Sequence, residues 1–184
     1  NDDGDNEIHL VIRSDISKPF DLKQSKVLIS GKRILRLSWL SDSKSFLFDQ
    51  LNTDHLYHSY SDIHQFNLQS EKASAITTNE RAIEAASSPS TPADKIRFTF
   101  VKLGPGRTEL WLSESGNRSQ LYAAPEQVRI SRPEFYSENE IIFAEKDLSG
   151  REVFKVIQTK NRQIRSVLED FAPVGFAKKS QKGL

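Results

Sequence analysis

The sequence predicts an all-β fold, a partial β-propeller built from four-stranded antiparallel blades. Apolar residues alternate or run continuously, and they seldom follow the 3.6-residue spacing of a helix. A bulky residue, a polar turn and an apolar strand recur along the chain. The positions of Trp39, Ser87 and Phe135 in this motif are each 48 residues apart. A period of this length is typical of one four-stranded propeller blade.

The first repeat shows the motif most clearly. A strand ends at Trp39, and Ser41 to Lys44 then supply turn chemistry, because Asp and Ser side chains hydrogen-bond the nearby backbone. The run Phe46-Leu47-Phe48 is apolar on both faces, which indicates a strand covered on both sides. The segment therefore predicts two antiparallel strands joined by a tight turn.

Each repeat continues with two further strands. Alternating apolar residues predict the third strand of each repeat at 62–68, 108–112 and 152–157. A polar turn follows each, and a shorter fourth strand is predicted at 73–77, 119–123 and 163–168. Strands are also expected at 7–13 and 26–30, ahead of the strand at 34–39.

These elements divide the chain into one partial propeller domain. We expect a partial blade, three blades and the start of a further blade, at 1–33, 34–79, 80–125, 126–170 and 171–184. Propellers close with about four to eight blades, so we expect an open ring, and the less favoured alternative is a four-bladed ring completed by both termini. We therefore expect the chain to be a fragment whose remaining blades lie in the parent chain or come from a protein partner. A homodimer through open blade edges is one such arrangement.

Composition narrows the classes of function. The 184 residues have a net charge of +1 with no basic patch, so no nucleic-acid partner is expected. No apolar run reaches membrane-spanning length, which argues against direct membrane insertion. Cysteine is absent, which excludes disulfides, thiol catalysis and thiolate metal sites. Methionine is absent too, which also favours a piece of a longer chain.

The repeated motif resembles the TolB-type propeller repeat. The first copy matches at Trp39, Ser41, Asp42, Lys44 and Phe48, the second at Ser88, Pro89, Asp94, Lys95 and Phe98, and the third at Pro133, Phe135, Ser137, Asn139 and Phe143. The resemblance covers about residues 34 to 178. It implies a bacterial protein that is periplasmic or associated with the envelope. The segments 57–63, 107–110 and 126–128 also look like envelope proteins that join such propellers to a peptidase-like domain.

Eight residues are expected to act as structural anchors of the repeat. Bulky aromatic residues at repeated positions are more often core than binding platform, which applies to Trp39, Trp111 and Phe135. The full set is Trp39, Asp42, Phe48, Pro89, Phe98, Trp111, Phe135 and Phe143.

The segment from Gln50 to Ser61 is the candidate binding site. It is predicted to be a loop longer than its counterparts, and aromatic residues on such a loop make good contact residues. The candidate binding residues are Asp54, His55, Tyr57, His58 and Tyr60. In the alternative interpretation, the tyrosines pack back onto the blade edge and the histidines are solvated.

No cofactor, metal or catalytic site is expected. His55 and His58 beside Asp54 are suitable zinc ligands, but no helix fixes their spacing and no fourth ligand is evident. No Gly-x-Ser-x-Gly motif is present. Glu138, Glu140 and Glu145 are predicted to face solvent, where general acid–base catalysis is not favoured.

We therefore expect a non-catalytic protein-interaction scaffold of the bacterial envelope. One alternative is an accessory propeller that controls substrate access in a larger peptidase. Another is the extracytoplasmic sensor domain of a membrane-anchored transcription regulator. The fold alone does not choose among these functions, because propellers carry many of them.

Overall fold

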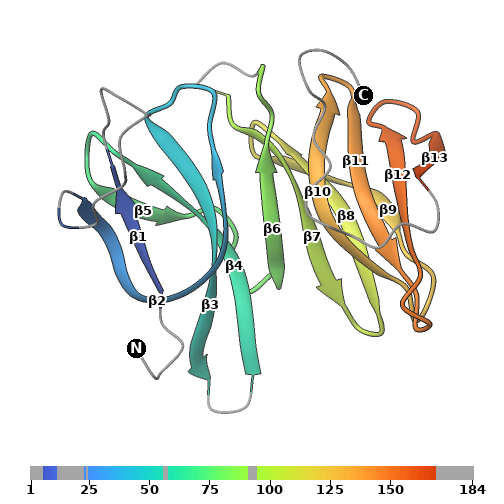
Figure 1. Cartoon of the computed structure of the whole chain (residues 1–184), viewed down its shortest axis with the longest axis horizontal. Helices are drawn as coiled ribbons and strands as arrows, with labels where there is room; N and C mark the ends of the chain where they lie inside the picture. Colours follow the sequence, from blue (N-terminus) through green and yellow to red (C-terminus); the bar gives the residue numbers. More distant parts are fainter. Residues whose placement is uncertain (1–5, 12–22, 24, 56–57, 91–94, 169–184) are drawn as a thin grey trace.

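The structure is a computed structural model that describes residues 6–11, 23, 25–55, 58–90 and 95–168. These ranges form β-strands joined by turns and short connections, and they contain no helix of the length and apolar character needed to cross a membrane. Three antiparallel sheets lie side by side in chain order (Figure 1). The predicted all-β fold, a partial β-propeller, is confirmed.

The first sheet has the order β1-β2-β3-β4-β5. Its strands are β1 (Asn6–Leu10), β2 (Lys26–Trp39), β3 (Ser45–His55), β4 (His58–Asn67) and β5 (Lys72–Ala75). The strands predicted at 26–30 and 34–39 are one continuous strand, β2. Its pairing changes from β1 to β3 just after Gly31, which has a φ of 64° and open space where a Cβ would lie.

The second and third sheets repeat one arrangement, in which each strand pairs with the next in the chain. The second sheet consists of β6 (Ala82–Ser87), β7 (Arg97–Gly104), β8 (Arg107–Glu114) and β9 (Asn117–Ala123). The third consists of β10 (Arg129–Ser137), β11 (Glu140–Lys146), β12 (Glu152–Gln158) and β13 (Ile164–Leu168).

The core consists of apolar layers between neighbouring sheets. Leu47 and Ile63 of the first sheet pack with Phe98 and Phe100 of the second. A second layer joins the second and third sheets and includes Val101, Leu110, Phe135, Phe143 and Ile157. Burying apolar area of this kind supplies most of the stabilisation that holds the sheets together.

The repeat anchors do not all lie in this core. Phe48, Phe98, Phe135 and Phe143 are buried, and Trp111 is half-buried. The core position predicted for Trp39 is wrong, because 46% of its surface is exposed. Pro89 is exposed as well. Asp42 has the predicted turn role, since its Oδ1 accepts hydrogen bonds from the backbone N–H groups of Lys44 at 2.8 Å and Ser45 at 3.0 Å.

Candidate functional site

The candidate binding segment is a long β-hairpin. Gln50 to Ser61 was predicted to be a loop, but β3 runs to His55 and β4 begins at His58. Pairing continues from the Gln50–Asp62 pair to the His55–His58 pair, beyond an irregularity that follows Asn52. Backbone pairing between β3 and β4 therefore outweighs the polar composition from which a loop was predicted. The two strands reach past the ends of β7, β8 and β12 (Figure 1).

The structure places one candidate side chain within the described part. Tyr60 is half-buried, and the guanidinium carbon of Arg81 lies 5.0 Å from the centre of its ring, within cation–π range. This contact agrees with the interpretation in which a tyrosine packs back onto the sheet. Tyr57 and the side chains of Asp54, His55 and His58 lie outside the described residues.

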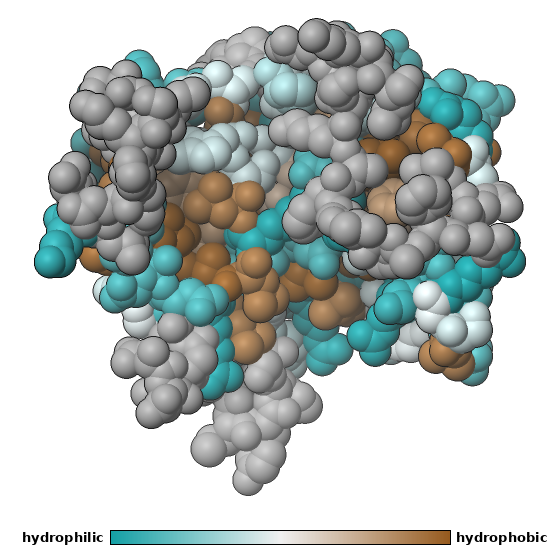
Figure 2. Space-filling view, in the orientation of Figure 1, coloured by the Kyte–Doolittle hydropathy of each residue, from teal (hydrophilic) through white to brown (hydrophobic). Residues whose placement is uncertain are grey.

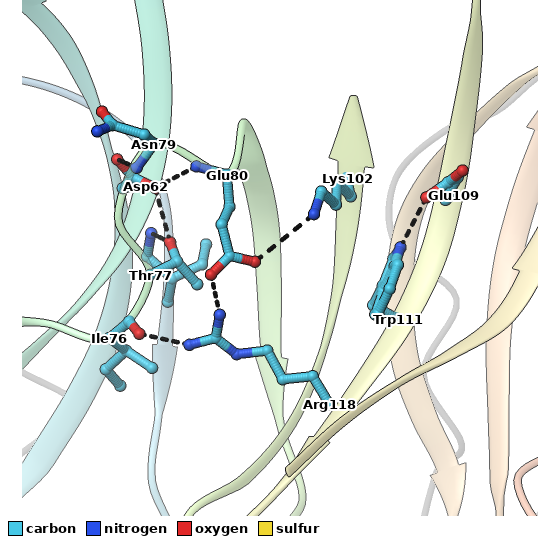
Figure 3. Close-up of polar contacts among 10 residues, drawn as sticks. Asp62, Ile76, Thr77, Asn79, Glu80, Lys102, Glu109, Trp111 and Arg118 are labelled. Carbon is cyan, nitrogen blue, oxygen red and sulfur yellow. Dashed lines mark hydrogen bonds and ion pairs between the residues drawn. The ribbon is translucent and has the colours of Figure 1, made fainter. Parts of the chain in front are cut away.

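The base of the hairpin is fixed by Asp62, which is buried. Its Oδ1 accepts hydrogen bonds from Thr77 Oγ1 at 2.9 Å and from the backbone N–H of Glu80 at 3.1 Å. Its Oδ2 accepts from the backbone N–H of Asn79 at 2.9 Å (Figure 3) and from Asn52 Nδ2 at 3.1 Å. The carboxylate therefore joins the hairpin to the connection that leads into the second sheet.

Glu80 extends this junction to the second sheet. Its carboxylate pairs with Arg118 and lies 3.7 Å from Lys102 Nζ. Arg118 also donates a hydrogen bond to the carbonyl of Ile76 at 2.5 Å (Figure 3). Lys102 Nζ is 5.1 Å from the centre of the Trp111 ring, so this cation is shared between a carboxylate and an aromatic partner.

A second polar cluster lies on the first strand of each repeat. Each of these strands has an irregular register at an equivalent place, and Arg36, Glu84 and Arg132 occupy it at 48-residue intervals. Glu84 and Arg132 have φ angles of 54° and 53°, in the left-handed region. Such bulges turn backbone groups out of the sheet, where side-chain partners can satisfy them.

Asp49 is one of these side-chain partners. It is fully buried, and it accepts hydrogen bonds from the backbone N–H groups of Arg36 at 2.5 Å and Glu84 at 2.9 Å. Burial raises the pKa of the Asp49 carboxyl, while the two N–H groups and the nearby Arg36 guanidinium oppose that rise. Glu84 has the same role toward the third sheet, because its carboxylate accepts the backbone N–H of Arg132.

Arginine side chains complete the cluster across the sheets. Arg36 reaches from the first sheet to the third, where it donates hydrogen bonds to Glu134 at 2.6 Å and to the carbonyl of Pro133 at 3.3 Å. Arg132 pairs with the buried Glu152 and lies over the ring of Phe154. These alternating charges therefore hold the three sheets together at the first strand of each repeat. We call these strands, which are residues 33–39 of β2, β6 and β10, the inner strands.

A third polar contact corrects a prediction. Glu145 was expected to face solvent, but it is buried and lies 2.5 Å from Lys155 Nζ. Burial, with the neighbouring Glu145 carboxylate, raises the pKa of Tyr122. Glu138 is exposed and Glu140 is half-buried beside Arg165. The strand pattern predicted one solvent-facing side, whereas the packing of the second sheet covers Glu145.

These clusters are networks of carboxylates, backbone N–H groups and cations. Within the described ranges, no group of three or more His, Asp or Glu side chains is close enough together to hold a metal ion. The carboxylates of Asp49, Asp62, Glu80 and Glu84 each bind backbone N–H groups or cations. One sequence signal would have found the second polar cluster. Its residues Arg36, Glu84 and Arg132 are spaced at the same 48-residue period as the repeated motif.

No protein-family model matches the sequence, and no curated protein sequence matches it. Solved structures do match the fold. An oligogalacturonate lyase in complex with manganese has a TM-score of 0.64 and 8% identity, over 87% of this chain and 48% of that chain. The β-propeller domain of the Trilobed protease from Pyrococcus furiosus has a TM-score of 0.55 and 10% identity, over 74% of this chain and 43% of that chain. The chain is a partial β-propeller.

TolB from Acinetobacter baumannii matches with a TM-score of 0.48 and 12% identity, over 80% of this chain and 46% of that chain. At such low identity, the matches show a propeller fold and nothing finer. The chain spans about half the length of the lyase and less than half that of the other two structures.

Proposed function

We propose that the chain is part of a non-catalytic propeller scaffold that binds a protein partner in the bacterial envelope. The observation that carries the proposal is the β3–β4 hairpin, which projects past neighbouring strands from a sheet fixed at its base by Asp62. A rigid sheet that presents an extended hairpin offers contact area at little cost in ordering. The resemblance of the repeat motif to the TolB-type repeat supports the envelope location.

The base of the hairpin suits this role. Four hydrogen bonds to Asp62 tie it to the connection that leads into the second sheet, and Arg81 covers the ring of Tyr60. Aromatic and histidine side chains occur at its far end in the sequence, at His55, Tyr57 and His58. Interfaces are enriched in aromatic anchors of this kind.

Site-specific photo-crosslinking tests the proposal. A photoreactive phenylalanine analogue at Tyr60 should give one discrete protein adduct in intact cells. The same analogue at Leu148, which is exposed on the turn between β11 and β12, is the matched control and should not give that adduct. Adducts that are the same from both positions, or none from Tyr60, would contradict the proposal.

A shortened hairpin adds a second test. Replacing residues 52–60 with Asn-Gly joins Leu51 to Ser61, which pair across the hairpin, through a favoured two-residue turn. A partner that recognises the far end should then lose most of its affinity in a pull-down with purified proteins. Retained affinity in a folded variant would mean that the partner binds elsewhere.

A second candidate is an accessory propeller that controls substrate access in a larger peptidase. The observation that favours it is the structural match to the propeller domain of the Trilobed protease. If the natural polypeptide cleaves peptides, the shortened hairpin should change the size of peptide accepted while leaving the cleavage of a dipeptide substrate unchanged. A polypeptide without peptidase activity would remove this candidate.

A further inference from the structure

We propose that the free edge of β1 receives two further β-strands, which cover Leu37 and Trp39 on β2. The two added strands complete a four-stranded blade ahead of the first full one. Its outer pair is already present as β1 and residues 26–32 of β2. The added strands belong to the same polypeptide, outside residues 1–184.

The first observation is an exposed apolar stripe on the inner half of β2. Leu35, Leu37 and Trp39 are 64%, 36% and 46% exposed. Large apolar side chains that gather on one strand of a sheet mark a contact surface more often than single ones do. Trp39 has one described ring neighbour, Phe46, whose ring centre is 5.4 Å away in an edge-on arrangement.

The repeat shows what covers this position elsewhere. Phe135 stands two periods after Trp39 and is only 6% exposed, because it packs in the layer between the second and third sheets. Arg97 of the second sheet lies over its ring at 5.1 Å and donates a hydrogen bond to the carbonyl of Glu138 at 2.5 Å. A preceding sheet therefore covers Phe135, whereas among the described residues no preceding inner strands lie over Trp39.

The second observation is that half of a preceding blade is present. Ile8, Leu28 and Ile29 pack on Phe46 and Phe48 of the first sheet. Lys26 also pairs with Glu71 at 2.5 Å, beside the turn between β4 and β5. This outer pair covers part of the apolar face and leaves the inner strand exposed.

Strand order identifies which strands are missing. In the chain, β8 and β9 precede the inner strand β10, and β12 and β13 are the third and fourth strands of the last sheet. By the same order, β1 and the first half of β2 are the third and fourth strands of the blade that precedes the one containing β3. The first and second places are the ones not filled, and they adjoin β1, which pairs with β2 alone among the described strands.

The third observation is the space itself. A hollow of about 740 Å³ lies between β1, at Asn6, Glu7 and Ile8, and the inner half of β2 from Ile34 to Leu37. Figure 2 shows apolar surface within a recess on this face of the molecule, near the region of β2 and β6 in Figure 1. Strand addition to a free edge supplies main-chain hydrogen bonds, and side-chain burial supplies the remaining stabilisation.

Length favours one polypeptide as the source. The chain spans 48% of the lyase structure and 43% of the protease propeller domain, so a ring of similar size needs about as much chain again. Strands in the same polypeptide also reach β1 at a high effective concentration, which a separate partner lacks.

The experiment uses Trp39 as the reporter. The sequence has two tryptophans, so Trp111→Phe leaves Trp39 as the single fluorophore. Chain 1–184 is compared with the natural polypeptide extended at both ends. In the extended protein, Trp39 emission should shift to shorter wavelength and acrylamide quenching should fall severalfold. In the matched control, Trp39→Phe, the emission of Trp111 should be the same at both lengths.

Two outcomes would overturn the proposal. One is equal quenching of Trp39 in both proteins. The other is shielding of Trp39 in chain 1–184 that rises with concentration together with a dimer mass by light scattering, which would assign the cover to a second copy. Amide hydrogen exchange on the unsubstituted proteins adds an independent check. Exchange at residues 6–8 should slow strongly in the extended protein, because added strands protect an edge.

Discussion

Asp62 shows how one buried side chain organises a junction between sheets. Its two carboxylate oxygens accept four hydrogen bonds, two of them from the backbone N–H groups of Asn79 and Glu80. A buried N–H group without a partner destabilises a protein, so the carboxylate determines the path of the chain from the first sheet to the second.

We predict that Asp62→Ala lowers the free energy of unfolding by about 2–3 kcal/mol, because it leaves buried donors unpaired. Asp42→Ala is the control. Asp42 also accepts two backbone N–H groups, but on an exposed turn where water can replace it, so the loss should be less than about 1 kcal/mol. Urea unfolding measures both. Equal losses would mean that the burial of Asp62 is unimportant.

Asp49 predicts a dependence on pH. Its pKa is raised above 3.8 by burial, so the folded chain binds this proton more tightly than the unfolded chain does. The stabilisation from that proton is present at low pH, and it is lost as the pH rises from about 3.8 through the folded pKa.

Asp49→Asn removes this titration. The amide keeps one acceptor for the two N–H groups of Arg36 and Glu84, so the variant should be less stable than the parent at every pH. The difference should be largest near pH 4 and should shrink toward pH 7, because the charged carboxylate of the parent becomes costly to bury. Urea midpoints across this range measure it. A difference that grows with pH would contradict the assigned shift.

At the scale of elements, the sequence predicted strands better than their ends. The strand periodicity and the 48-residue repeat predicted the three sheets, because both record which side chains must face an apolar layer. The long β3–β4 hairpin was missed, since polar residues from Asn52 to Asp54 are typical of a loop and strand pairing overrides that preference. Side-chain contacts between sheets, such as Arg36 with Glu134, carry no local signal.

The outer pair formed by β1 and the first half of β2 gives an element-scale prediction. Leu28 packs on the Phe46 and Phe48 cluster, whereas its neighbour Val27 is 45% exposed. Leu28→Ser should therefore lower the free energy of unfolding by about 1–2 kcal/mol, and the matched Val27→Ser by less than about 0.5 kcal/mol. Thermal unfolding compares them. Equal effects would show that the outer pair does not stabilise the first sheet.

At the scale of the whole molecule, the inner strands are joined by charge as well as by apolar packing. Arg36 links the first sheet to the third through Glu134, and the bulged backbone N–H groups of Glu84 and Arg132 are each bound by a carboxylate of the preceding sheet. Partly buried pairs of this kind tolerate the loss of one partner poorly, because the remaining charge stays desolvated.

We predict that Arg36→Met lowers the free energy of unfolding by about 2–3 kcal/mol, because it leaves Glu134 and Glu84 without that cation. Adding Glu134→Gln should restore part of the loss. Arg165→Met is the control, since its pair with Glu140 is more exposed and should contribute less than about 0.5 kcal/mol. Guanidinium would screen the pairs, so urea is the denaturant. No recovery in the double variant would argue against the pair.

Because β2 is one continuous strand, the boundary of the sequence repeat differs from the boundary of the sheet. The repeat divides the chain between residues 33 and 34, yet one continuous strand pairs with β1 up to Lys32 and with β3 from Arg33 onward. A protease that cut there would separate β1 from the sheet that supports it. The sequence repeat and the hydrogen-bonded sheet therefore have different boundaries, because one strand belongs to both sides of the repeat boundary. Insertions between sheets should be tolerated in the exposed connection at 125–127, and not at Gly31 or at 77–80, where Asp62 binds the chain.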